Sequence, residues 1–108
     1  MGIFAVQVHG LVERPVDGVA SLGVRPTVDD SGRVLLETHC FDWPAELGAE
    51  GGYGKIVRVE LLHKLHDELR YTSLEALTAG IAKDGRDARA FFASTHAETH
   101  RQTTRDRI

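Results

Sequence analysis

The chain has 108 residues, a net charge of −3 at neutral pH, a pI near 6.0 and ordinary shares of apolar (42%) and charged (27%) residues. This size predicts one soluble domain with a modest core, and the acidic balance argues against binding to nucleic acid. No apolar run is long enough to span a bilayer, and Met1–Phe4 lacks the positive region of a signal peptide. The lone cysteine, Cys40, fits a reducing, cytoplasmic setting.

The first half of the chain carries three segments with strand patterns. Residues 3–8 (IFAVQV) are apolar and rich in strand-forming side chains. Residues 18–24 form a second strand that ends before Pro26, which lacks the donor that a strand ladder needs. Residues 34–42 (VLLETHCFD) predict a buried strand. The turn residues Asp29–Gly32 indicate that the second and third strands form an antiparallel hairpin.

The second half changes from a strand to a helix pattern. Residues 43–54 are glycine-rich and predict a surface loop, and in residues 55–65 apolar and charged side chains alternate as in a half-buried strand. A capping box then predicts a helix, with Thr72 as the N-cap and Glu75 reaching back to it. Its apolar residues are expected to cover the side of the sheet: Leu74, Leu77, Ile81 and Phe91.

Several short strands followed by one helix indicate a mainly β protein, an antiparallel barrel or sandwich with a helix at its side. Gly80 and Gly85 weaken the helix by about 1 kcal/mol each relative to alanine, which favours a kink or an early end near residue 85. Apolar periodicity stops at residue 95. Residues 1–94 are therefore expected to form the domain, and residues 95–108 a disordered tail.

Glu37 stands out because it is a carboxylate amid the apolar residues of the third strand. Taken alone, it reads as an outward-facing strand residue. Six segments suggest another role for it: Ile3–Val6, Gly23–Thr27, Leu36–His39, Tyr53–Lys55, Val59–Glu68 and Ser73–Leu77. In their order and approximate spacing these segments resemble the riboflavin kinase family, and the resemblance covers about residues 2–92.

The chain is most similar to the C-terminal kinase domain of bacterial bifunctional riboflavin kinase/FMN adenylyltransferase, also called FAD synthetase. The resemblance implies a six-stranded Greek-key β-barrel, incomplete here, with a helix after the last strands. It implies transfer of the γ-phosphoryl group of ATP to the ribityl 5′-hydroxyl of riboflavin, which gives FMN and ADP, with Mg²⁺ as cofactor. An adenylyltransferase domain in the parent protein is a partner that it suggests.

The resemblance also implies roles for single residues. Glu37 would be the catalytic base that takes the hydroxyl proton while phosphorus is attacked. Nucleotide contacts are implied for Cys40, Asp42 and Tyr53, of which Tyr53 also fits an aromatic residue that closes a glycine-rich loop.

Flavin contacts are implied for His66, Leu69 and Tyr71. His66 stands where the family usually has arginine, Leu69 where lysine is common, and Tyr71 where phenylalanine is usual. The ring of Tyr71 is suited to stacking on the isoalloxazine.

One family motif is absent. Riboflavin kinases carry a Gly-x-Pro-Thr-Ala-Asn segment whose threonine and asparagine hold Mg²⁺ and the ATP phosphates, and this sequence does not contain it. No metal-binding residue is therefore assigned. The barrel is expected to lack its first strand or strands and to have an unpaired edge, and the isolated chain is expected to have little or no kinase activity.

Two other classes of function remain open. A metal-binding module would use histidine and cysteine side chains, with candidates at His39, Cys40, His63, His66, His96 and His100. The three-residue spacing of His63 and His66 on a strand would point them to opposite faces, which argues against this alternative. The second is a non-catalytic flavin-binding or assembly module that dimerises through its exposed edge.

Overall fold

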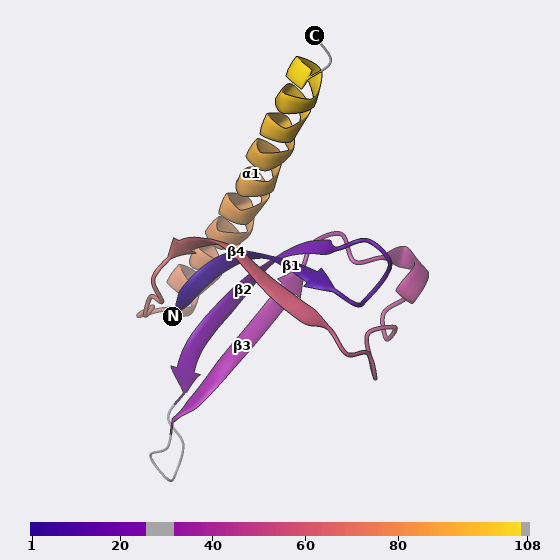
Figure 1. Cartoon of the computed structure of the whole chain (residues 1–108). Coiled ribbons are helices and arrows are strands. Elements are labelled where there is room, and N and C mark those ends of the chain that lie inside the picture. The colour runs from indigo at the N-terminus through magenta and orange to yellow at the C-terminus, as the bar shows by residue number, and fades with distance from the viewer. Residues whose placement is uncertain (26–31, 107–108) are drawn as a thin grey trace.

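The computed structural model describes the backbone of residues 1–25 and 32–106, and the side chains of residues 1–24 and 32–95. Within this part, four strands form one antiparallel sheet and a long helix follows (Figure 1). The elements are β1 (Gly2–His9), β2 (Val16–Arg25), β3 (Arg33–Cys40), a short 3₁₀ turn (Ala45–Leu47), β4 (Arg58–His66) and α1 (Leu74–Asp106). Residues 26–31, with most of the predicted turn, lie outside the described residues.

The strand order in the sheet is β3-β2-β1-β4. The strands β1, β2 and β3 follow one another as antiparallel neighbours, and β4 returns along the far side of β1. This is the Greek-key order. The four predicted strands and the predicted hairpin of β2 with β3 are therefore confirmed.

The sheet is open and does not close into a barrel. Among the described residues, β3 and β4 are edge strands that pair only with β2 and β1 respectively. The prediction that 34–42 is a buried strand was wrong, because most residues of β3 are exposed. An edge strand has one neighbour, and little of the described chain covers the faces of this one.

The β4 strand is irregular opposite the first half of β1. Its register with β1 shifts between Ile3 and Phe4 and again between Ala5 and Val6, as β-bulges produce. Each bulge adds a residue to β4 and reverses the side to which the following side chains point. The register is unshifted from Arg58 to Leu61, so the alternation of side-chain direction is interrupted only beyond Leu61, which is itself 43% exposed.

Two small clusters form the core. On the face that carries α1, Ala5 and Phe41 pack with Ala88 and Phe92 of the helix. A second cluster, around Val8, Leu11 and Val16, is covered by Leu47. The apolar residues of β1 thus contribute to both clusters, and this strand lies at the centre of the fold.

The helix α1 begins with Ser73, not Thr72, as its N-cap, since the Ser73 hydroxyl accepts a hydrogen bond from the Ala76 amide at 3.1 Å. The helix is unbroken at Gly85 and continues to Asp106, so the predicted early end is wrong. The helical backbone thus includes most of the predicted tail, and the division of the chain at residue 94 stays a prediction.

The predicted contact face of α1 is only partly right. The side chains of Leu74 and Ile81 are 77% and 62% exposed, whereas Ala88 and Phe92 are buried and Phe91 packs beside them. The helix therefore contacts the sheet through its middle turns, and its first turns lie further from the sheet.

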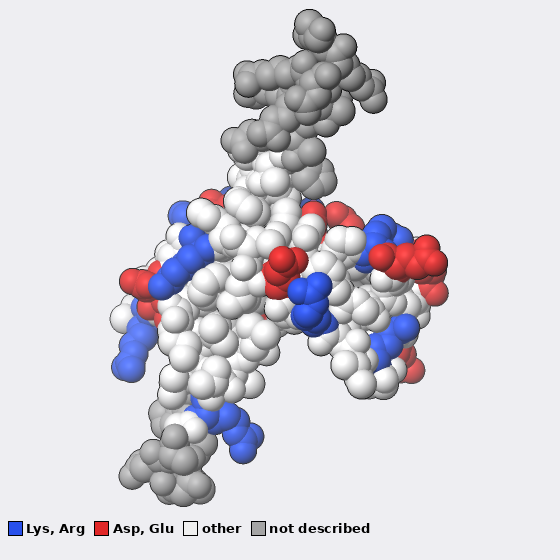
Figure 2. Space-filling model, in the orientation of Figure 1, with Lys and Arg blue, Asp and Glu red and all other residues white. Residues whose placement is uncertain are grey.

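Apolar side chains are also exposed on the sheet. Val24 and Val34 are register partners and are 50% and 61% exposed, and Leu36, on the same side of β3, is 41% exposed. Figure 2 shows few charged side chains over β2 and β3.

In the described part of the chain, no helix contains an apolar stretch that is long enough to cross a bilayer.

Truncation to alanine at Phe92 and at Leu77 of α1 should lower the free energy of unfolding by different amounts. Phe92→Ala should lower the free energy of unfolding by about 3–5 kcal/mol because it leaves a cavity in the core. Leu77→Ala should cost roughly 1 kcal/mol or less, because Leu77 is already 39% exposed. Urea denaturation followed by circular dichroism measures both, and a cost for Leu77→Ala as large as that for Phe92→Ala would contradict docking mainly through the middle turns.

Candidate functional site

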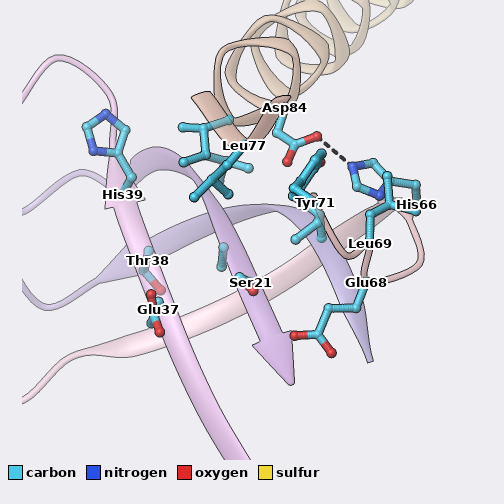
Figure 3. Close-up of a pocket in the computed structure, with 14 residues that line it drawn as sticks. Ser21, Glu37, Thr38, His39, His66, Glu68, Leu69, Tyr71, Leu77 and Asp84 are labelled. Atoms are coloured by element: carbon cyan, nitrogen blue, oxygen red, sulfur yellow. Dashed lines mark hydrogen bonds and ion pairs between the residues drawn. The ribbon is translucent and has the colours of Figure 1, made fainter. Parts of the chain in front are cut away.

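A pocket of about 420 Å³ lies between the helix-bearing face of the sheet, the first turns of α1 and the segment that joins β4 to α1. We call this segment, Asp67–Thr72, the strap. Apolar side chains line much of the pocket: Ile3, Val19, Leu69, Tyr71, Leu77 and Ile81. Polar side chains complete the lining: Ser21, Glu37, Thr38, His39, His66, Glu68 and Asp84 (Figure 3).

Glu37 reaches the pocket because of its register. It lies on β3 directly opposite Ser21 of β2, and both residues line the pocket. The neighbouring register pair of Leu36 and Leu22 lies on the other side of the sheet. Glu37 is one of the exposed residues of this lining.

The strap fits closely against two glycines. A Cβ atom added to Gly80 of α1 would overlap the phenol group of Tyr71, and one added to Gly23 of β2 would overlap the carboxyl group of Glu68. Side chains of the strap therefore lie directly on the backbone of a helix and of a strand. These contacts hold Leu69 and Tyr71 at the wall of the pocket.

His66, the last residue of β4, links the sheet to α1. Its Nε2 atom lies 2.5 Å from Oδ1 of Asp84, and its Nδ1 atom lies 2.6 Å from the backbone oxygen of Asp67. The hydrogen bond to Asp84 is the largest cause that raises the pKa of His66, followed by the bond to Asp67. The side chains of His66 and Asp84 are 24% and 13% exposed, so this pair is largely shielded from solvent.

Asp84 was not predicted as a site residue from the sequence. It follows Leu77 by seven residues and Ile81 by three, which places all three on one side of a helix. The helical period was thus a signal that Asp84 faces the same space as the apolar residues that were singled out.

The structure brings together only part of the predicted site. Glu37 shares the pocket with His66, Leu69 and Tyr71, the residues expected to contact flavin. The three residues expected to contact the nucleotide do not line it.

These three residues have other surroundings. Cys40 packs beside the second core cluster, and burial raises the pKa of its thiol. Asp42 has a positive φ of 49° in the turn after β3, and its carboxylate lies 3.5 Å from the guanidinium of Arg89. Tyr53 is 85% exposed in the β3–β4 connection.

The described residues contain no cluster of three or more histidine, cysteine, aspartate or glutamate side chains placed to hold a metal ion. The prediction that His63 and His66 point to opposite faces was wrong, because a bulge between them leaves them opposite Ala5 and Ile3 on one face. The ring of His63 stacks on Phe91 at 4.9 Å. The side chains of His96 and His100 lie outside the described residues.

The similarity of the chain to known proteins extends over most of its length. The family model for riboflavin kinase (flavokinase) matches residues 1–92. The chain belongs to the riboflavin kinase family. This is a family of phosphotransferases, and the predicted resemblance is confirmed.

Two curated relatives are bifunctional riboflavin kinase/FMN adenylyltransferases. The protein from Escherichia coli (strain K12) is 44% identical over 94 residues, which are 87% of this chain and 28% of the relative. The protein from Haemophilus influenzae is 38% identical over 93 residues, 86% of this chain and 28% of the relative. The chain thus spans little more than a quarter of the length of either relative.

A solved structure shares the fold. It is described as a macrolide-efflux protein from Streptococcus pneumoniae, and it matches 82% of this chain and 27% of its own chain with a TM-score of 0.65 at 24% identity. At this identity the match supports the arrangement of strands and helix and nothing more.

The close packing of the strap predicts opposite effects for two glycine substitutions in α1. Gly80→Ala should destabilise the protein, although alanine favours a helix, because the new Cβ would displace Tyr71. Gly85→Ala is the matched control. It meets no atom within 4 Å and should stabilise the protein by about 1 kcal/mol. Thermal unfolding of both variants tests this, and stabilisation by both would show that Tyr71 does not lie on Gly80.

Proposed function

We propose that the chain is a riboflavin kinase domain that transfers the γ-phosphoryl group of ATP to the ribityl 5′-hydroxyl of riboflavin. One observation supports this most. The carboxylate of Glu37 lines the same pocket as His66, Leu69 and Tyr71. Figure 3 shows Glu37 on β3 and these three residues on the opposite side, at the end of β4 and on the strap. A flavin held at the strap would extend its ribityl chain toward Glu37.

Glu37 is proposed to act as the general base. Its carboxylate takes the proton of the 5′-hydroxyl, the hydroxyl oxygen forms a bond to the γ-phosphorus, and the bond to ADP breaks. Phosphoryl transfer depends mainly on positioning and on charge stabilisation. The hydrogen-bonded pairing of β3 with β2 supplies the positioning, because it fixes the backbone that carries Glu37.

The strap is proposed to hold the isoalloxazine ring. A pocket of about 420 Å³ lies within the range common for small-molecule sites. Tyr71 offers an aromatic face for stacking, and Leu69 adds apolar area. His66 at the rim supplies a polar contact where the family usually has arginine.

The nucleotide side of the reaction has less support. Cys40, Asp42 and Tyr53 remain proposed ATP contacts, although they lie outside the pocket that contains Glu37. The Thr/Asn motif that binds Mg²⁺ in the family does not occur in this sequence. We therefore propose that the chain alone binds flavin and turns over slowly, in a cytoplasmic setting. An adenylyltransferase part, as in the bifunctional relatives, is the proposed partner.

A second candidate is a flavin-binding or assembly module without catalysis. The open sheet favours it, because β3 offers an unpaired edge and exposed apolar side chains. Dimerisation through β3 would be visible in sedimentation equilibrium.

A direct test separates the two candidates. The chain should quench riboflavin fluorescence on binding and should form FMN from riboflavin and Mg-ATP only slowly, as seen by radiolabel transfer and chromatography. Quenching without any label in FMN would favour the non-catalytic module. Rapid turnover would show that the chain has a complete phosphate site.

The proposed base predicts a specific kinetic effect. Glu37→Gln keeps the shape of the side chain but cannot accept the proton. It should reduce the rate of FMN formation about 10²–10⁴-fold and leave riboflavin affinity nearly unchanged. Glu50→Gln, at an exposed position outside the pocket, is the matched control and should have the parent rate. Equal rates for the two variants would remove Glu37 from the mechanism.

A further inference from the structure

Both nitrogens of the His66 ring face acceptor atoms. The backbone oxygen of Asp67, 2.6 Å from Nδ1, can only accept, so Nδ1 must carry a proton. Nε2 lies 2.5 Å from the carboxylate of Asp84. A neutral imidazole would direct its remaining lone pair at that carboxylate, whereas an imidazolium donates to both oxygens.

Charged groups around His66 come from several elements. From α1, Asp84 and Asp87 favour the imidazolium, and Lys83 disfavours it. From the strap, Asp67 is paired with Lys64 of β4 at 2.5 Å. From β3, the carboxylate of Glu37 lines the same pocket. Negative groups thus predominate, which agrees with a protonated ring.

The location of the His66–Asp84 pair indicates which parts of the structure it connects. His66 is the residue immediately before the strap, and Asp84 lies one turn of α1 beyond Gly80, on which Tyr71 rests. The ion pair therefore ties the beginning of the strap to the same helix surface that supports its end. If the pair opens, the wall of the pocket formed by Leu69 and Tyr71 loses one of its attachments.

We propose that His66 and Asp84 form a protonated positioning pair that fixes the strap, so that binding of riboflavin in the pocket is coupled to one proton on His66. In this proposal Asp84 acts through His66, whose ring it orients. The identity of the ligand rests on the proposed function, whereas the protonated pair and its hold on the strap do not.

The direction of the pH dependence follows from the raised pKa of His66. The pair stabilises the fold fully at pH values below the ordinary histidine pKa of about 6.5, and this contribution is lost as the pH rises through the raised pKa of the folded state. Riboflavin affinity should begin to fall as the pH passes the His66 pKa of the ligand-free folded chain, by about ten-fold for each unit by which bound riboflavin raises that pKa further.

The first experiment needs no ligand. ¹⁵N NMR of the imidazole should show both His66 nitrogens protonated at neutral pH, and the amide signals of Leu69 and Tyr71 should titrate together with His66. In Asp84→Asn the pKa of His66 should return toward its ordinary value, and the strap signals should shift with it. A neutral His66 ring, or strap signals that do not follow it, would overturn the proposal.

The second experiment measures riboflavin affinity by fluorescence from about pH 5.5 to about pH 8.5, the range in which histidine titrates. The parent chain should lose affinity with rising pH. His66→Arg, which stays charged, should keep its affinity throughout, and His66→Gln should bind weakly at every pH. Identical profiles for the parent and Asp84→Asn would overturn the coupling.

A matched control is available elsewhere in the sheet. His9 also lies 2.9 Å from a carboxylate, that of Glu60, but neither residue lines the pocket. His9→Gln should leave the pH profile of binding unchanged, and a changed profile would show that His66 is not the group responsible. If the parent chain does not bind riboflavin, the proposed function fails, while the NMR titration still decides the positioning pair.

Discussion

The contact between α1 and the sheet determines where the pocket lies. Ala5 and Ala88 are fully buried in one cluster, and their small side chains leave room for the flanking rings of Phe41 and Phe92. Because this contact lies at the middle turns of the helix, the first turns lie further from the sheet. The strap and the side chains of the first turns enclose the space that remains, and this space is the pocket.

Local patterns were sufficient for the elements of the fold. The apolar segment of β1 and the turn residues near Asp29 correctly placed strands and the hairpin, because period-2 patterning and turn chemistry act over a few residues. An incomplete barrel with an unpaired edge was expected, and the structure has an open sheet that does not close into a barrel. Closure depends on what pairs with the edges β3 and β4, and no local pattern contains that information.

Some residues of the candidate site were predicted from the sequence, but the contacts that support the pocket were not, for a physical reason. Glu37 and Tyr71 were singled out through a family resemblance, and the structure places both at one pocket. The support of that pocket comes from contacts between residues distant in the chain, such as Glu68 against Gly23 and His66 with Asp84. A sequence records such contacts only indirectly, for example as a glycine inside a helix where alanine would otherwise be favoured.

The bulges of β4 have a consequence for how this segment can vary among homologues. The bulge that lies between His63 and His66 places both on one face of the sheet, although an unbroken strand would separate them. Loss of one residue between these positions would turn His66 away from α1 and carry the strap with it. The length of the segment should therefore be more strongly conserved in evolution than the identity of its exposed side chains, and gaps in alignments should fall in the β3–β4 loop instead.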